Sequence, residues 1–539
     1  MKSPEHVAII GCGFAGTSAF FQLVDRCPVK RITIFEVSGR FGPGYPYRPD
    51  ECPDYLINNT TDTMCLAPSN RRAFLGWLRG RPGCAEDLDE QGHLPRAVFG
   101  AFLEEVFCAT RTIAAVKAID VRLVPAAAQA IREDEQGRVH ITSPQGEVAA
   151  DMVLLTCGRC PDIGGVDRPG EAAGARYVAS HIRSRGLDDL PMDARVHVLG
   201  ASLSAYDVVN RLFSADTGCR FERDEAGAPV FVPGPNHRHV ILCSRSGRLK
   251  NVQSPVPTPI RRRHFTLSGL RAAAAEDDGL TLKAVAGLIR REAEAHGAAL
   301  DWEAVADPYA GCGDADAVNR RAGSLLEAAL AAAKGAGPEN FLVDFFGDAQ
   351  VDIWDAFAER LLTPGQERLY RRTFETAVLS YAAPCPVPTA ERLLALHRAG
   401  RLSLVKGVGE VSLAADGSHY QIAHEFGSAR AAFLVNTMGQ VDRRVTSPGQ
   451  SALTRNLAAS GLLSPYCLDG VESDGAAVDM TTFRAKGASN IYLANMFLWG
   501  PGFFTSSAFL MATIVERLLD GVFGFKQDGA DRHSEHHTR

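Results

Sequence analysis

A glycine pattern near the N-terminus constrains this chain more than any other feature. Gly11, Gly13 and Gly16 form a Gly-x-Gly-x-x-Gly sequence between the apolar run 7–10 and a helical stretch. In such a turn the first glycine makes the tight bend, the second admits the backbone to a pyrophosphate, and the third lets helix and strand pack closely. Glu36 ends the next predicted strand, where a carboxylate accepts hydrogen bonds from ribose hydroxyls. The sequence therefore predicts an N-terminal βαβ dinucleotide-binding unit.

The same order of strand, turn and helix recurs in the middle of the chain. Residues 195–199 predict a strand, which Gly200-x-Ser202-x-x-Ala205 and a helical stretch follow. The next predicted strand ends at Ser244 and Arg245 instead of an acidic residue, and this favours the 2′-phosphate of NADPH over the free ribose of NADH. The predicted NADPH contacts are Gly200, Ser202, Leu203, Ser204, Ala205, Ser244, Arg245 and Arg248.

Composition places the chain among ordinary globular proteins. It has 539 residues, of which 46% are hydrophobic and 22% charged, and its net charge is −6. This balance disfavours a general nucleic-acid or membrane binder. The polar N-terminus has no signal-peptide pattern and the 13 cysteines form no regular framework, so we expect a cytoplasmic protein with free thiols. No metal-ligand spacing is visible, and we expect no metal site.

The pattern of strands and helices predicts an α/β fold with two Rossmann-like domains and a helical insert. The first domain is expected to comprise residues 1–165 and 400–525, and the second 166–266 and 336–399. An alanine-rich segment, 267–335, is expected to form the helical insert. The polar tail 526–539 is expected to be disordered.

Several local sequences resemble a known family. Residues 42–47 read Gly-Pro-Gly-Tyr-Pro-Tyr, residues 57–59 read Ile-Asn-Asn, Pro95 precedes Arg96, and residues 244–248 read Ser-Arg-Ser-Gly-Arg. In these elements the chain resembles the bacterial FAD/NAD(P)-binding flavoproteins with two dinucleotide-binding domains, which are related to class B N-hydroxylating monooxygenases. The resemblance covers nearly the whole chain except 267–335.

The resemblance implies FAD on the first unit and NADPH on the second. It also implies that residues 154–158 and 434–439 pass near FAD, and that residues 491–495 form the last FAD strand, with Asn495 where an aspartate is usual. The turn 500–505 would place its N–H groups against the flavin. The implied FAD contacts are Gly11, Gly13, Phe14, Ala15, Gly16, Glu36, Tyr45, Asn58, Asn59, Thr60, Met64, Arg96, Val124, Cys157, Gly158, Asn495, Gly502, Phe503, Phe504 and Thr505.

Three reaction classes use such a scaffold: disulfide oxidoreductases, electron-transfer reductases and flavin monooxygenases. A disulfide oxidoreductase is disfavoured, because Cys157 and Cys160 end a strand committed to FAD and are interpreted as packed thiols. The Baeyer–Villiger fingerprint Phe-x-Gly-x-x-x-His is absent before Gly200, where only Ser180-His181 stands in a comparable place. The resemblance therefore favours an NADPH-dependent monooxygenase that N-hydroxylates a small amine or amino acid through a flavin C4a-hydroperoxide. A diaphorase-type reductase that passes electrons to a protein or quinone stays open, as does a flavin-bound sensor.

The substrate is less constrained than the cofactors. Arg261 and Arg263 follow a proline-rich loop and are candidates to hold a carboxylate, which would suit an acidic amino acid such as aspartate. Asn58, Asn59 and His181 are the candidate catalytic residues. The expected partners are a small molecule and O2, and a homo-oligomer is compatible with the sequence. The insert either roofs the flavin or forms an interface between subunits.

Overall fold

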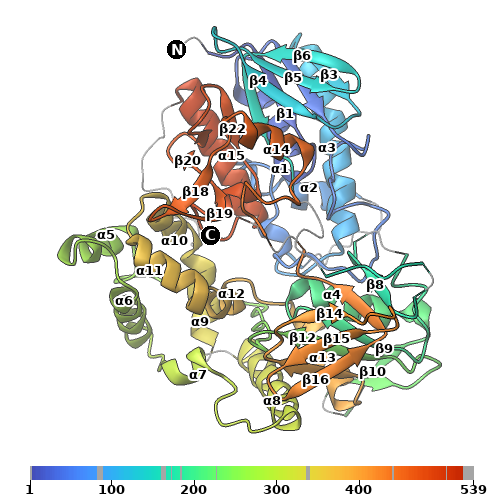
Figure 1. The fold of residues 1–539 in the computed structure, drawn as a ribbon. Helices are drawn as coiled ribbons and strands as arrows, with labels where there is room; N and C mark the ends of the chain where they lie inside the picture. Colours follow the sequence, from blue (N-terminus) through green and yellow to red (C-terminus); the bar gives the residue numbers. More distant parts are fainter. Residues whose placement is uncertain are drawn as a thin grey trace.

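The computed structural model describes residues 3–81, 89–158, 166–171, 173–182, 185–225, 227–335, 340–439, 442–505 and 507–525. Three lobes are visible in Figure 1. The upper lobe combines the N-terminal and C-terminal parts of the chain, the lower right lobe carries the second glycine-rich turn, and the lower left lobe is helical. The tail 526–539 lies outside the described residues.

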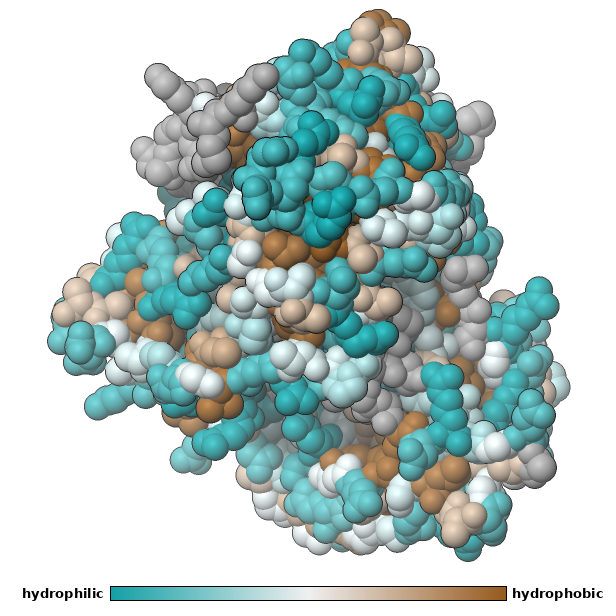
Figure 2. All heavy atoms as spheres, turned by 45° about the horizontal axis from the view of Figure 1, so that its top comes forward, coloured by the Kyte–Doolittle hydropathy of each residue, from teal (hydrophilic) through white to brown (hydrophobic). Residues whose placement is uncertain are grey.

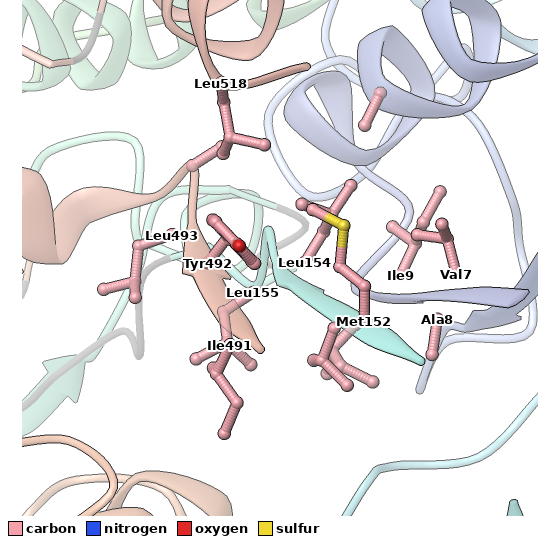
Figure 3. Packing of buried hydrophobic residues seen from close by; sticks show 14 of the residues in the cluster. Val7, Ala8, Ile9, Met152, Leu154, Leu155, Ile491, Tyr492, Leu493 and Leu518 are labelled. Carbon is pink, nitrogen blue, oxygen red and sulfur yellow. The ribbon is translucent and has the colours of Figure 1, made fainter. Parts of the chain in front are cut away.

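A seven-stranded sheet forms the core of the first lobe. Its strands, in spatial order, are β20 (Val478–Asp479), β21 (Arg484–Ala485), β22 (Ile491–Leu493), β7 (Met152–Leu155), β1 (His6–Ile10), β2 (Arg31–Phe35) and β3 (Asp120–Val124). β1 and β7 are buried along their whole length, as expected for parallel strands covered on both faces. Figure 3 shows apolar side chains of β1, β7 and β22 packed together.

Helices and smaller β-elements complete this lobe. The helices are α1 (Phe14–Arg26), α2 (Ala73–Arg79), α3 (Arg96–Val116), α14 (Ala452–Ala459) and α15 (Ala508–Phe523). The β-elements are a meander of β4 (Ala130–Glu133), β5 (Val139–Ser143) and β6 (Gly146–Ala150), and a hairpin of β18 (Pro465–Leu468) and β19 (Val471–Ala476). Because α1 contacts both α3 and α15, the first glycine-rich turn is held by segments from the two ends of the chain.

A five-stranded parallel sheet forms the core of the second lobe. Its strands, in spatial order, are β13 (Leu402–Lys406), β12 (His239–Ser244), β9 (Arg195–Leu199), β17 (Phe433–Asn436) and β8 (Arg176–Val178). The helices of this lobe are α4 (Leu203–Leu212), α8 (Ala315–Lys334) and α13 (Val387–Arg398), and its β-elements are β10 (Arg220–Arg223), β11 (Pro229–Val232), β14 (Val411–Leu413), β15 (Tyr420–His424) and β16 (Gly427–Ala431).

This sheet corrects the expected domain boundary at residue 400. β13 pairs with β12, and β17 pairs with β9, so both strands complete the second sheet instead of returning to the first. The chain re-enters the first lobe only after β17. Sequence periodicity does not encode which neighbour a strand pairs with, and the expected boundary therefore lies too early in the chain.

The helical lobe has a different extent from the expected insert. Its helices are α5 (Leu267–Glu276), α6 (Leu282–Ala295), α7 (Trp302–Ala306), α9 (Phe341–Asp348), α10 (Gln350–Ala358), α11 (Pro364–Leu369), a π-helix (Tyr370–Phe374) and α12 (Glu375–Ala382). α5 and α6 share an apolar cluster with α9 and α10. α8, although inside the alanine-rich segment, packs its buried face on α13 and β13. The segment 267–335 is therefore divided between two lobes.

The surface in Figure 2 is covered mostly by hydrophilic residues and is hollowed between its lower left and lower right parts. Within the described ranges, no helix is both long and apolar enough to cross a membrane.

The close packing of the first turn predicts how two glycine-to-alanine variants differ. A Cβ at Gly16 would lie 2.0 Å from the carbonyl oxygen of Gly11, whereas a Cβ at Gly287, inside α6, meets nothing within 4 Å. Gly16→Ala should therefore lower the free energy of unfolding by about 1–3 kcal/mol or more. Gly287→Ala should raise it by about 0.5–1 kcal/mol, because alanine is the better helix former. Urea unfolding compares the two, and equal effects would contradict the packing.

Candidate functional site

The carboxyl ends of three neighbouring strands meet at the first glycine-rich turn. The Thr156 amide donates to the Ile10 carbonyl, and the Ala494 amide donates to the Leu155 carbonyl. The Thr156 hydroxyl also donates to the Gly11 carbonyl over 2.7 Å. These bonds align the ends of β1, β7 and β22, the edge at which parallel α/β sheets bind nucleotides.

The turn itself leaves backbone donors available. Gly11 has φ +98°, a conformation that favours glycine, and Gly13 is the N-cap of α1. No described side chain caps α1, so its first N–H groups and the positive end of its dipole face outward for an anion. Gly44 approaches from the Gly-Pro-Gly-Tyr-Pro-Tyr loop, and a Cβ on Gly44 would lie 2.5 Å from the Gly13 Cα.

Glu36 lies beside this turn at the end of β2. One carboxylate oxygen accepts the Cys12 amide over 2.8 Å, and the other accepts the amide and hydroxyl of Ser38. A carboxylate offers about four acceptor positions, so this set leaves room for a further donor such as a ribose hydroxyl. Val124 lies next to it, because its carbonyl accepts the Glu36 amide. The first site therefore fits the dinucleotide expected from the sequence.

The second glycine-rich turn repeats this arrangement. Gly200 has φ +122°, and Ser202 is the N-cap of α4 without a side-chain cap from any described residue. The Thr437 hydroxyl donates to the Leu199 carbonyl over 2.7 Å, as Thr156 does at the first turn. The segment 434–439, expected near FAD, thus ends beside Gly200. The reason is the pairing of β17 with β9.

The loop after β12 holds two arginines in different surroundings. The Ser244 hydroxyl accepts a hydrogen bond from the Gly247 amide, and the Gly407 amide donates to the Arg245 carbonyl. These two hydrogen bonds fix the backbone of the loop. The Arg245 side chain is exposed and, within the described part of the chain, makes no ion pair. Arg248 instead donates to the carbonyls of Val305 and Ala306 at the end of α7. Of these two arginines, Arg245 is therefore the one available to a phosphate.

The turn 500–505 joins the first lobe to the helical lobe. A Cβ at Gly502 would lie 2.3 Å from the ring of Trp354 on α10, and Phe503 stacks on Phe357 of the same helix at 5.9 Å between centroids. Phe504 has φ +45°, an uncommon conformation for a bulky residue. Asn495 caps the 3-10 helix Met496–Trp499 by accepting the Phe497 amide, and its amide nitrogen lies 3.9 Å from the Cys157 sulfur.

An arginine from the helical lobe binds the same turn. Arg371 donates to the carbonyls of Gly500 and Gly502 and pairs with Glu367 and Glu375. Burial raises the pKa of Glu375, and the Arg371 charge opposes that rise. Lys250 bridges the second and helical lobes in a similar way, because its amine donates to the Leu379 carbonyl over 2.6 Å, and burial lowers its pKa to about 8.

A buried charge cluster joins the first and second lobes. Arg96, at the start of α3, forms a 2.7 Å ion pair with Asp207 on α4, and the two side chains are 11% and 6% exposed. His181 Nε2 lies 3.3 Å from the same Asp207 oxygen, and its ring packs against Tyr55. Arg392 and Asp54 form a second pair between the lobes. Arg96 and His181, predicted for FAD and for catalysis, thus meet at this interface.

The remaining predicted contacts are spread around the first lobe. Tyr45 is exposed and bonds the Ser180 hydroxyl, while Met64 is fully buried in an aromatic cluster with Phe74 and Phe99. The described contacts of Thr60 are with Asp62 and Thr63. Asn58 and Asn59 are half-buried in the loop before it. Gly158 follows β7, and Cys160 lies outside the described residues, so the Cys-x-x-Cys interpretation stays a prediction.

The arginine loop 261–263 belongs to the helical lobe. Arg262 pairs with Asp348 and Asp352, and buried Glu292 accepts the backbone amides of Arg263, His264 and Phe265. The side chains of Arg261 and Arg263 are exposed. Carboxylates of α6, α9 and α10 therefore hold the loop in place.

Several site residues were missed by sequence reasoning. Asp207, Trp354 and Arg371 make the contacts described above but belong to no local motif. One usable signal existed, since Asp207 stands in the apolar run Tyr206–Val209 of α4, where an acidic residue needs a buried partner. The other two depend on contacts between segments more than a hundred residues apart.

Comparison with known proteins agrees with this architecture. Residues 8–160 match the family model described as FAD-NAD(P)-binding. A search of the curated proteins finds no match. The chain is similar to the ornithine N-hydroxylase of Kutzneria sp. 744, at a TM-score of 0.55 and 15% identity, over 96% of this chain and 99% of that one. It is also similar to L-lysine 6-monooxygenase from Pseudomonas syringae, at 0.52 and 14%, with the same coverage. The family model confirms the predicted FAD/NAD(P)-binding character of the N-terminal region. The similar structures confirm the predicted α/β fold.

Removing one partner of the buried pair Arg96–Asp207 should lower stability strongly, and removing both partners should restore most of it. Arg96→Met leaves Asp207 buried without its arginine, so the free energy of unfolding should fall by about 3–5 kcal/mol. The double variant Arg96→Met/Asp207→Leu should recover most of that loss. The exposed pair Arg31 and Asp120, with side chains 57% and 62% exposed, serves as the control. Arg31→Met should cost less than about 1 kcal/mol. A double variant no more stable than Arg96→Met would contradict this account.

Proposed function

We propose that this chain is an FAD-dependent monooxygenase that uses NADPH and O2 to N-hydroxylate a small amine or amino acid. The observation that carries the proposal is the packing of the helical lobe on the turn 500–505. Trp354 and Phe357 cover that turn, and Arg371 ties it to the π-helix. A reductase that serves a protein partner needs an accessible flavin edge, whereas a monooxygenase needs its flavin shielded from water.

Both nucleotide sites fit the proposed cofactors. At the first, the uncapped start of α1 binds the pyrophosphate of FAD and Glu36 accepts from its ribose. At the second, the uncapped start of α4 binds the pyrophosphate of NADPH, and Arg245 binds its 2′-phosphate. The similarity of fold to an ornithine N-hydroxylase and a lysine monooxygenase supports this assignment and the choice of an amine.

The overall reaction consumes one amine, one O2, one NADPH and one proton, and yields the hydroxylamine, NADP+ and water. FAD supplies the redox chemistry that passes two electrons from NADPH to oxygen. The protein's part is to orient the two cofactors and to exclude water. The Arg96–Asp207 pair fixes one nucleotide lobe against the other, which sets the approach of NADPH to FAD.

A coupling measurement tests the proposal. The FAD-loaded protein is given NADPH and O2 with a panel of amines and amino acids, including ornithine, lysine and aspartate, and product and H2O2 are quantified against NADPH consumed. The proposal expects one amine that accelerates NADPH oxidation and yields a hydroxylamine in near-stoichiometric amount. Rapid reduction of a quinone or a protein acceptor, with no hydroxylamine from any amine, would identify a reductase. Absence of NADPH oxidation with every acceptor would identify a sensor.

Coenzyme preference should depend on Arg245. A charge-assisted contact with the 2′-phosphate contributes about 1.5–3 kcal/mol, so Arg245→Ala should raise KM for NADPH about tenfold to a hundredfold and leave KM for NADH nearly unchanged. Arg220→Ala, an exposed arginine of β10 in the same lobe, should change neither value. Equal losses with both coenzymes would show that Arg245 does not bind the phosphate.

Shielding by the helical lobe should depend on Trp354. Trp354→Phe leaves a gap over Gly502, so a larger fraction of the NADPH consumed should appear as H2O2 while FAD content stays the same. Trp77→Phe, in α2 and half-buried, should leave the peroxide fraction unchanged. If the peroxide fraction of Trp354→Phe equals that of the unmodified protein, the helical lobe does not shield the flavin.

A further inference from the structure

A pocket lies between the π-helix of the helical lobe and the hairpin β18–β19 of the first lobe. Its volume is about 530 Å³, within the range of small-molecule sites. α11 contacts β18 directly, and Figure 1 shows α11 beneath the hairpin. None of the residues assigned above to FAD, NADPH or the amine lines this pocket.

Three arginines and one carboxylate line the pocket. Arg368 pairs with Asp469 and donates to the Leu468 carbonyl, and Arg371 is the arginine that holds the turn 500–505. Arg372 is exposed and makes no ion pair with any described residue. The carboxylate, Glu472, is engaged by the amide and hydroxyl of Thr446. Asp469 neutralises Arg368, and Glu367 and Glu375 neutralise Arg371. Among the described lining residues, Arg372 is therefore the cation left to a ligand.

The same pocket has an apolar wall. Leu369, Leu468 and Val471 line it; Leu468 is buried, Leu369 is half-buried and Val471 is 64% exposed. An apolar surface next to an unpaired guanidinium matches a ligand that has an anionic end and an apolar body. Arg371 and Arg372 are neighbours in the π-helix; Arg371 binds the turn 500–505, while Arg372 is exposed. Such π-helical turns are frequent at functional sites.

We infer that this pocket is a binding site for a small organic carboxylate with an apolar body. The carboxylate binds Arg372, and the body packs on Leu369 and Val471. A guanidinium pairs with a carboxylate through two parallel hydrogen bonds, which gives the site its preference for that group.

Binding is tested on the FAD-loaded full chain without NADPH, so the result does not depend on the proposed reaction. Hexanoate is the probe, hexanamide its uncharged counterpart, and inorganic phosphate the anion without an apolar body. Ligand-observed NMR titration should give saturable binding of hexanoate, at least about tenfold tighter than that of hexanamide or phosphate. Phosphate that binds as tightly as hexanoate would overturn the role of the apolar wall.

Two matched variants locate the probe. Arg372→Gln should weaken hexanoate about tenfold and leave hexanamide unchanged, while Arg220→Gln, at an exposed arginine of the second lobe, should leave both unchanged. Val471→Ser should weaken hexanoate and hexanamide alike, because it removes the apolar contact. Circular dichroism confirms that each variant is folded. Equal affinity of hexanoate and hexanamide, or of the unmodified protein and Arg372→Gln, would overturn the site.

Discussion

The close approach of neighbouring segments at the glycine-rich turns is the constraint on which the rest of the structure depends. A Cβ at Gly16 would lie 2.0 Å from the Gly11 carbonyl oxygen, and a Cβ at Gly44 would lie 2.5 Å from the Gly13 Cα. At the first turn no Cβ stands between helix and sheet at Gly16, so α1 packs directly on its strand and its first amides reach the strand edge. At the second turn the close contact is between Gly200 and the Thr437 hydroxyl, 2.6 Å from where a Cβ would be, and Ala205 stands at the third position of the pattern.

The three lobes then act on one another through a small number of polar contacts. Arg96 and Asp207 connect the nucleotide lobes, while Arg371 and Lys250 connect the helical lobe to each of them. Each contact gives a buried charge or a carbonyl its hydrogen-bond partner. That partner is lost if the lobes change their orientation, so each contact favours one arrangement of the lobes. The aromatic packing of Trp354 and Phe357 on the turn 500–505 adds a water-excluding surface where the flavin is proposed to lie. The carboxylate pocket shares Arg371 with that surface, so the two neighbouring sites are joined through one side chain.

The helical segment was the least predictable part of the chain. Its alanine-rich composition correctly indicated helices, yet α8 packs on the second sheet while α5 and α6 pack on α9 and α10. An alanine-rich amphipathic helix suits either partner, because its narrow apolar face fits many surfaces. The prediction that Arg261 and Arg263 hold a substrate stays a prediction; their side chains are exposed, while Arg262 between them is occupied by Asp348 and Asp352.

The sequence by itself determined the two βαβ units, the strand ends that carry Glu36 and Arg245, and the α/β class. These features are local, since each depends on glycine spacing and strand periodicity within about 30 residues. Only the tertiary structure decided that β13 and β17 complete the second sheet, that Arg96 meets Asp207, and that Trp354 covers Gly502. Such pairings join residues far apart in the chain. They are selected by complementary shape and charge after the elements have formed, and no local pattern records them.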